Sequence, residues 1–191
     1  MYLIGIDEVG RGCLAGPVVV SAVLIRKGIW LPKGLKDSKK LTEKQRNEWL
    51  VYIKSNPKII FASATVSPKI IDRINISGAA NLAALRAFSR LPTVRHAKIY
   101  LDGGLYLKNK KYQKNFNAET MIKGDQKINV IKLASIVAKV KRDKMMTKLG
   151  KLFPKYCFDV HKGYATKIHR EAIKKNGLCD WHRRSFCKNF C

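Results

Sequence analysis

The sequence predicts an α/β fold in which a mixed five-stranded sheet is flanked by helices, with a further helical region at the carboxyl end. Segments rich in β-branched and aromatic residues come first and then alternate with helical patterns. This order is typical of a sheet that contains both parallel and antiparallel neighbours. The chain has 191 residues, 46% of them hydrophobic, and no evident linker or repeat, so we expect a single domain over residues 1–191.

Five strands and four helices are expected in chain order. The strands lie at residues 2–7, 18–25, 59–66 and 98–102, with a weaker one at 119–122. The helices lie at residues 42–54, 78–90, 130–149 and 166–175. The first helix begins at a capping box, in which the side chains of Thr42 and Gln45 satisfy exposed backbone N–H groups. The last ends at Asn176 and Gly177, which form a good helix terminus.

The helix expected at 130–149 carries the clearest amphipathic pattern. Its apolar stripe consists of Leu133, Ile136, Val137 and Val140. We expect Lys139, Lys141 and Arg142 to turn away from this stripe. Asp143 lies one turn beyond Lys139, so we assign it a structural role as the partner of that lysine.

The chain is strongly basic, with 39 Lys and Arg against 13 Asp and Glu, a formal net charge of +26. Such a field attracts phosphate backbones without reading their sequence, which makes nucleic acid the expected partner. The alternative is that the charge serves only solubility or passive binding to ribosomal RNA.

The amino terminus begins with a strand pattern rather than with a signal peptide, and the longest apolar stretch, residues 17–25, is too short to span a membrane. We therefore expect a cytoplasmic protein without membrane contact. The five cysteines form an odd set weighted to the carboxyl end, which favours reduced thiols. A zinc site built from Cys179, His182, Cys187 and Cys191 is the weaker alternative, because the spacing lacks paired C-x₂-C motifs.

Two adjacent acids, Asp7 and Glu8, follow the first apolar strand and run into Gly10 and Gly12. Adjacent residues on a regular strand point to opposite faces, so both acids can face one site only if the strand ends or bends there. The two glycines supply that freedom and let the backbone approach a ligand closely.

Two further acids lie where a metal site would need them. Asp102 closes the fourth strand, and Asp125 precedes the long helix. A pair of divalent cations such as Mg²⁺ needs several carboxylates that converge from different segments. For any one of these aspartates a turn residue is the simpler interpretation, but four of thirteen acids in such places favour a metal site.

Residues 5–12, GIDEVGRG, followed by LAGPVV at 14–19, resemble the signature of ribonuclease HII, the type 2 ribonucleases H. Further segments follow in the order of that family: DSKKL at 37–41, YLDG at 100–103, KGD at 123–125, ASIVAKV at 134–140, KGY at 162–164 and HRRSF at 182–186. The resemblance covers essentially the whole chain. Val9 and Cys13 depart from the usual alanine and proline of the family.

The resemblance implies a ribonuclease H-like fold and a metal-dependent endoribonuclease. It implies two-metal hydrolysis, with Mg²⁺ or Mn²⁺, of the phosphodiester on the 5′ side of ribonucleotides. The implied substrates are RNA-DNA hybrids and single ribonucleotides embedded in duplex DNA, and the products carry 3′-hydroxyl and 5′-phosphate ends. It further implies a role in ribonucleotide removal from DNA and in RNA primer degradation.

The resemblance also assigns roles to individual residues. Asp7, Glu8, Asp102 and Asp125 match the catalytic metal-binding acids. Gly10, Arg11 and Gly12, together with Tyr164, would recognise the 2′-hydroxyl and the RNA-to-DNA junction, and Lys39 and Lys40 would contact the phosphate backbone. Taken singly, Tyr164 could be a core residue and each lysine a solvated surface residue.

Two other classes of protein fit the sequence less well. Ribonuclease HIII would carry an extra amino-terminal domain and a different loop after the paired acids. A non-enzymatic basic binder would explain the charge but has no use for four carboxylates that repel phosphates. The last four residues, 188–191, show no evident sliding-clamp motif, so we expect no clamp partner, and we expect a monomer.

Overall fold

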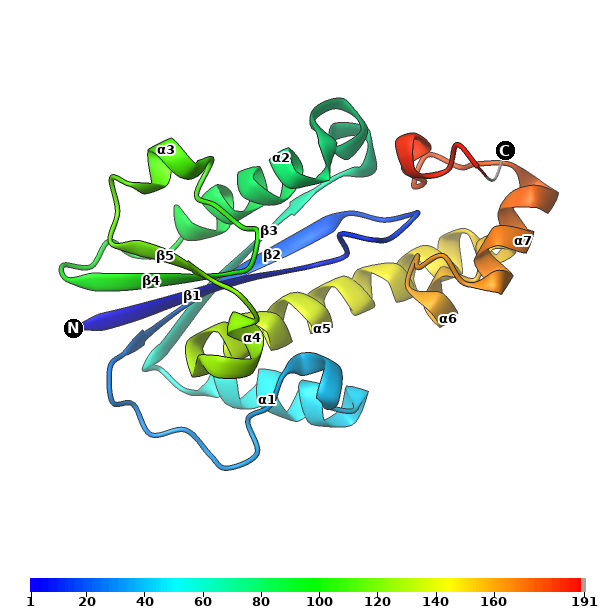
Figure 1. The fold of residues 1–191 in the computed structure, drawn as a ribbon. Coiled ribbons are helices and arrows are strands. Elements are labelled where there is room, and N and C mark those ends of the chain that lie inside the picture. The colour runs from blue at the N-terminus through cyan, green and yellow to red at the C-terminus, as the bar shows by residue number, and fades with distance from the viewer. Residues whose placement is uncertain (190–191) are drawn as a thin grey trace.

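The computed structural model describes residues 1–189 and contains a five-stranded sheet in the order β3-β2-β1-β4-β5. β2 is antiparallel to both β1 and β3, whereas β4 is parallel to both β1 and β5. The mixed five-stranded sheet is therefore confirmed (Figure 1). The strands are β1 Tyr2–Val9, β2 Val18–Arg26, β3 Ile59–Val66, β4 Ala97–Asp102 and β5 Ala118–Met121.

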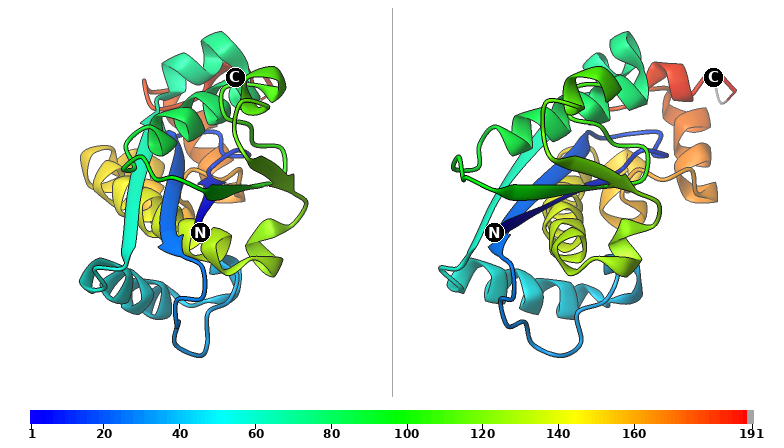
Figure 2. Two further views of the ribbon diagram at one scale, coloured as in Figure 1. Left: turned by 90° about the vertical axis from the view of Figure 1, so that its left-hand side faces the viewer. Right: turned by 60° about the vertical axis from the view of Figure 1, so that its left-hand side comes forward.

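Helices cover both faces of the sheet, as the two views in Figure 2 show. The longer helices are α1 Glu43–Ser55, α2 Pro68–Phe88, α5 Asn129–Leu152 and α7 Lys167–Asn176. Short helices, which are too brief for a periodic pattern to predict, are α3 Lys110–Gln113, α4 Gly124–Lys127 and α6 Phe158–His161, with 3₁₀ turns at Ser38–Lys40, Pro154–Tyr156 and Arg184–Phe186. The predicted capping box of α1 is present, with Thr42 and Gln45 bonding reciprocally.

The core lies in two layers because side chains alternate along the strands. On β2, Val20 and Leu24 pack toward α2, while Val23 and Ile25 pack toward α5 and α1. Gly5 on β1 lets α5 approach the sheet closely, since a Cβ at this position would lie 2.4 Å from the Val130 carbonyl. This close contact places the start of α5 beside the middle of β1.

The prediction for the second helix was wrong at its start, which lies at Pro68 rather than at Gly78. Ser67 and Pro68 form a helix start of their own, with proline in the first turn. The helix breaks at Asn75, where φ is +59°, and the Asn75 side chain accepts a hydrogen bond from the Gly78 N–H at 2.9 Å. The predicted segment is thus the second part of a kinked helix.

The carboxyl-terminal residues form the expected helical region at the far end of α5 (Figure 1). Asp72 on α2 anchors this region, because its carboxylate accepts hydrogen bonds from the backbone N–H groups of Arg184 and Ser185 at 2.9 and 3.0 Å. Within residues 1–189, no helix combines the length and the apolar character needed to cross a membrane.

Candidate active site

The paired acids lie on a strand that continues past them. β1 runs to Val9 and pairs with β2 along its whole length, so the expectation that it ends or bends at Asp7 and Glu8 was wrong. Pairing with β4, in contrast, stops at Ile6. Beyond that point the β4 edge of β1 is unpaired, and Asp7 and Glu8 lie in this unpaired part of the strand.

Three of the four candidate acids converge at this edge. Carboxylate oxygens of Asp7, Asp102 and Asp125 all lie within 4.8 Å of one another. Asp7 comes from β1, Asp102 from the end of the parallel strand β4, and Asp125 from α4. Parallel neighbouring strands bring their carboxyl ends to one edge of a sheet, which explains why the first two meet.

Asp102 is oriented by the chain that brings in Asp125. Its Oδ1 accepts hydrogen bonds from the N–H groups of Gly124 at 2.7 Å and Asp125 at 3.3 Å. A Cβ on Gly124 would lie 3.2 Å from that same oxygen and 2.5 Å from Ile131. Gly124 therefore permits the close approach that joins α4 to the end of β4.

Asp7 is buried, and burial raises its pKa well above the ordinary value, with the charges of Glu8 and Asp102 adding to the effect. The Ser135 hydroxyl on α5 opposes this rise in the pKa of Asp7. Ser135 also lies 2.8 Å from Ser38, hydroxyl to hydroxyl, and both serines are buried. The Asp7 carboxylate accepts a hydrogen bond from the Glu8 N–H, which donates to Oδ1 at 2.7 Å.

Glu8 lies beside the group of three but outside it. Burial raises its pKa to about 7; Arg11 opposes this shift and Asp102 adds to it. Its Oε1 is 3.6 Å from Arg11 Nη1, while its Oε2 is buried without a hydrogen-bond partner in the described chain.

These oxygens suit a divalent cation. Burial and neighbouring carboxylates raise the pKa values of Asp7 and Glu8, so added positive charge is favourable here, and carboxylate oxygens are the hard ligands that Mg²⁺ and Mn²⁺ prefer. The unpartnered Glu8 Oε2 adds an oxygen that lacks any protein donor. The three aspartates could thus hold a metal ion, with Glu8 beside them.

We call residues 10–16, which follow β1, the glycine loop. Arg183, which is fully buried, holds this loop from the inside of the protein. Its guanidinium donates to the carbonyls of Arg11 at 2.8 Å, Gly10 at 2.6 Å and Gly16 at 2.9 Å. In a trans peptide the C=O and N–H point in opposite directions, so the N–H groups of Arg11 and Gly12 face away from Arg183. Within residues 1–189 neither N–H has a protein acceptor.

Arg142, which was predicted to turn away from the apolar stripe of its helix, is fully buried. The second half of α5 leaves the sheet and is covered by two loops. Arg142 donates to the carbonyls of Pro17 at 3.0 Å, Ala15 at 3.0 Å and Lys162 at 2.7 Å, and so joins these loops. Gly10, with φ of +94°, makes room for it, since a Cβ there would lie 2.3 Å from the Arg142 Nε.

Tyr164 lies beside the glycine loop rather than in the core, with 40% of its surface exposed. The residue before it, Gly163, accepts hydrogen bonds from Leu14 and Ala15 at 2.9 and 3.3 Å. The Tyr164 hydroxyl interacts with the thiol of Cys13. The structure thus places the tyrosine beside the glycine loop.

The two candidate lysines differ in their surroundings. Lys39 Nζ lies 3.1 Å from Asp125 Oδ2, and the side chain is otherwise largely exposed. Lys40 is exposed on the same 3₁₀ turn. Asp143 pairs with Lys139 at 2.9 Å, which confirms its structural role.

No individual role was predicted from the sequence for Ser38, Ser135 or Arg183, although all three lie in segments that resemble the family. Their signal is weak because a buried serine or arginine resembles a surface one in sequence.

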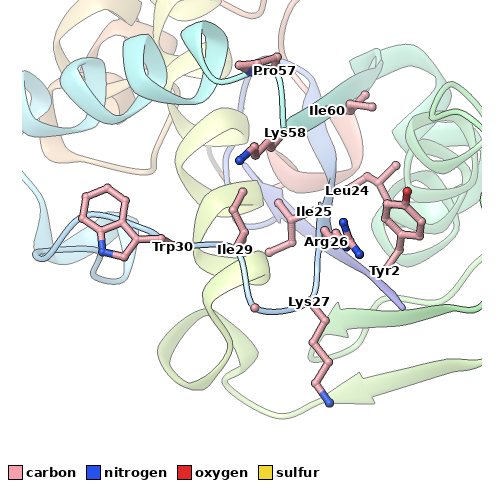
Figure 3. A pocket seen from close by; sticks show the side chains of 11 residues that line it. Tyr2, Leu24, Ile25, Arg26, Lys27, Ile29, Trp30, Pro57, Lys58 and Ile60 are labelled. Atoms are coloured by element: carbon pink, nitrogen blue, oxygen red, sulfur yellow. The ribbon is translucent and has the colours of Figure 1, made fainter.

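A cavity of about 650 Å³ lies away from the acids, at the amino-terminal end of β1 (Figure 3). Tyr2, Arg26, Lys27, Trp30 and Lys58 are among its lining residues, which include no acid.

Residues 4–189 match the sequence model of the family described as Ribonuclease HII. The chain belongs to the ribonuclease HII family. The Ribonuclease HII of Pelagibacter ubique (strain HTCC1062) is 46% identical over 185 residues, which are 96% of this chain and 95% of that protein. The Ribonuclease HII of Bacillus cereus (strain B4264) is 45% identical over 186 residues, 97% of this chain and 68% of that protein. Membership makes the chain a metal-dependent nuclease of the ribonuclease H type, as the resemblance implied.

Solved structures confirm the α/β fold. The chain superimposes on the ribonuclease H2 of Pyrococcus horikoshii OT3 with a TM-score of 0.78 and 24% identity, covering 100% of this chain and 97% of that one. The ribonuclease HII of Archaeoglobus fulgidus, solved in a complex with PCNA, gives 0.80 and 27% identity, with coverages of 96% and 94%. Residues 190 and 191, the end of the segment judged for a clamp motif, lie outside the described chain.

The zinc alternative for this ribonuclease HII chain finds no support among residues 1–189. Cys179 Sγ lies 3.2 Å from His182 Nδ1, but Cys187 instead faces the Leu14 carbonyl at 3.8 Å. The metal-ligand grouping in this part of the chain consists of aspartates alone. Cys191, the fourth residue of the alternative, lies outside the described residues.

Three buried histidines lie near Tyr164. Because of them, we expect this member of the ribonuclease HII family to lose stability in mild acid. Burial lowers the pKa of His169 and of His182 from 6.5 to about 4 and lowers that of His161. The unfolded chain therefore binds protons that the folded chain excludes. The contribution is complete above about pH 6.5 and is lost as the pH falls toward 4, up to roughly 3 kcal/mol for one ring.

Urea unfolding at pH 7, 6 and 5 measures this loss. Asp7 and Glu8 act in the opposite direction in metal-free protein, because their pKa values are raised. The His169→Asn variant isolates the contribution of this histidine. Its free energy of unfolding should depend less steeply on pH than that of the wild type. Equal slopes for the two proteins would contradict the prediction.

Proposed function

We propose that the chain cleaves RNA-DNA hybrids and duplex DNA with single embedded ribonucleotides on the 5′ side of a ribonucleotide, leaving 3′-hydroxyl and 5′-phosphate ends. The observation that carries this proposal is the convergence of Asp7, Asp102 and Asp125 at the sheet edge where β1 leads into the glycine loop. A phosphodiester at the carboxylates would thus have its neighbouring sugar within reach of backbone donors. Cleavage and ribonucleotide recognition would then share one site.

Asp7, Asp102 and Asp125 would hold two divalent cations, Mg²⁺ or Mn²⁺, with Glu8 as a further ligand. When bound, such a pair activates the attacking water and stabilises the leaving oxygen. The protein's own contribution is orientation. The Glu8 N–H holds Asp7, and the Gly124 N–H holds Asp102, so both carboxylates are placed before a substrate arrives.

The N–H groups of Arg11 and Gly12 are the donors that we assign to the 2′-hydroxyl. A 2′-hydroxyl is the group that distinguishes RNA from DNA at one nucleotide. The carbonyls of Gly10 and Arg11 are occupied by Arg183, so the N–H groups of the same two peptides point the other way. A Cβ on Gly12 would meet no atom within 4 Å, which leaves the backbone accessible there.

Tyr164 would pack on the sugar of the following nucleotide, and Lys39 and Lys40 would contact phosphates. Tyr164 is half exposed beside the glycine loop, as this role needs. Lys39, which now pairs with Asp125, would exchange that partner for a phosphate when cations occupy the aspartates. The charge of +26 supports binding to a duplex of any sequence.

We expect the Tyr164→Ala variant to cleave a duplex with one ribonucleotide more slowly, while its metal affinity stays near that of the wild type. Losing an aromatic contact to nucleic acid costs about 1–3 kcal/mol, or roughly 5- to 150-fold in rate. Single-turnover cleavage of a labelled duplex measures the effect.

The Tyr164→Phe variant is the matched control, because it keeps the ring and should keep most of the rate. Wild-type protein should cut the duplex once, on the 5′ side of the ribonucleotide, and leave an all-DNA duplex intact. An unchanged rate in Tyr164→Ala, or equal cutting of all-DNA duplex, would remove the assignment of this pocket.

A further inference from the structure

Three buried histidines lie behind the segment that carries Tyr164, and the proposed cleavage does not use them. They are His161 on α6, His169 on α7 and His182, which forms a bridge with Ala15. The rings of His161 and His169 stack with centroids 4.2 Å apart. His169 Nε2 lies 3.1 Å from His182 Nε2.

The backbone partners of these rings determine where each proton lies. The Cys179 N–H donates to His182 Nδ1 at 3.0 Å, so this nitrogen carries no proton. A neutral His182 then carries its proton on Nε2 and donates it to His169 Nε2. His169 in turn carries its proton on Nδ1, which lies 2.8 Å from the Tyr164 carbonyl. The chain of donors is thus ordered from Cys179 to Tyr164.

His161 is fixed in the same way. It accepts the Gly163 N–H on Nδ1 at 3.1 Å, so its proton lies on Nε2 and is donated to the Tyr156 carbonyl at 2.7 Å. All three rings are neutral with one defined tautomer each. Two adjacent residues, Gly163 and Tyr164, therefore have their backbone held by imidazoles.

We propose that His169 and His182 are positioning residues that set the place of Tyr164 through its carbonyl, with His161 holding Gly163. The inference rests on the proposed role of Tyr164 in reading the sugar. The Gly163 carbonyl accepts hydrogen bonds from the N–H groups of Leu14 and Ala15, so the segment that carries Tyr164 is also bonded to the glycine loop. The histidines thereby fix the distance between the tyrosine and the backbone donors.

Any added proton would disrupt this arrangement. Each ring already accepts a hydrogen bond on its unprotonated nitrogen, from a backbone N–H at His161 and His182 and from the His182 ring at His169. A charged ring would turn that acceptor into a donor and set two donors face to face. This chain of hydrogen bonds from Cys179 to Tyr164, which we call the histidine relay, requires neutral imidazoles. Burial of the rings favours the neutral form.

The first test measures the protons directly. Long-range ¹H–¹⁵N spectra of metal-free wild-type protein at pH 7 distinguish the two neutral tautomers and the imidazolium. We expect the proton on Nδ1 for His169 and on Nε2 for His161 and His182. A charged ring, or Nε2–H on His169, would overturn the relay without any reference to cleavage.

The second test separates positioning from folding. We expect His169→Leu to slow cleavage of the single-ribonucleotide duplex by about tenfold, because the Tyr164 carbonyl loses its donor. His169→Asn places an amide near Nδ1 and should restore most of the rate. Ile173→Ala, which opens a cavity one turn along α7, controls for stability and should keep the rate at a temperature where it is folded.

A double-mutant cycle decides whether His169 acts by positioning Tyr164 or by a general effect on folding. If His169 acts through Tyr164, then His169→Leu has no further effect on the rate in a Tyr164→Ala background. An equal loss in both backgrounds would overturn the proposal. Failure of the proposed function gives a different result, an unchanged rate in Tyr164→Ala alone, whatever the histidine spectra show.

Discussion

The Asp102→Asn variant is expected to lose cleavage by about a thousandfold or more while it still binds duplex. The substitution keeps the size of the side chain and its acceptor for the Gly124 N–H, so the fold around the site is retained. It removes one of three charges that hold the proposed cations, which contribute several kcal/mol to the transition state. Asp7→Asn should have the same effect.

The measurement combines single-turnover cleavage with equilibrium binding to a duplex containing one ribonucleotide. Binding should be equal or tighter, because each variant removes a negative charge beside the phosphates. Glu119→Gln is the matched control: it removes an acid that pairs with Lys98 on the sheet, away from the site. Cleavage in excess chelator, or an Asp102→Asn variant as active as Glu119→Gln, would contradict the metal assignment.

The sequence pointed to these acids because Asp7 and Glu8 follow an apolar run, Asp102 closes a strand and Asp125 precedes the long helix. Strand ends can be read from short apolar runs, and parallel strands bring them to one edge. It did not predict how Asp7 and Glu8 share the site, because the answer depends on β4 pairing with β1 only up to Ile6. That difference between the two edges of one strand has no local signature.

The buried polar residues were the least predictable part. Arg142 lies on a helix that is amphipathic near the sheet, and its pattern continues unchanged where the helix leaves the sheet for other contacts. Local sequence cannot tell an arginine bound to solvent from one bound to three carbonyls. The resemblance pointed to the segment around Arg183 without showing that its guanidinium holds the glycine loop.

We expect Arg183→Met to lower the free energy of unfolding by about 3–5 kcal/mol. The substitution removes a buried charge, which is favourable, but leaves the carbonyls of Gly10, Arg11 and Gly16 without this donor. Burial lowers the pKa of Arg183 only to about 10, so the guanidinium is charged at neutral pH and its hydrogen bonds are charge-assisted. A domain of ordinary stability would lose much of its 5–15 kcal/mol.

Urea unfolding of the metal-free protein measures the loss, and Arg184→Met is the matched control, because Arg184 is exposed and only its backbone N–H bonds Asp72. That control should lie within about 0.5 kcal/mol of the wild type. Arg183→Lys keeps the charge but lacks the planar fork that reaches three carbonyls, so it should restore only part of the stability. If Arg183→Met were as stable as the control, the glycine loop would have to keep its shape without Arg183. The outward direction of the Arg11 and Gly12 N–H groups would then need another cause.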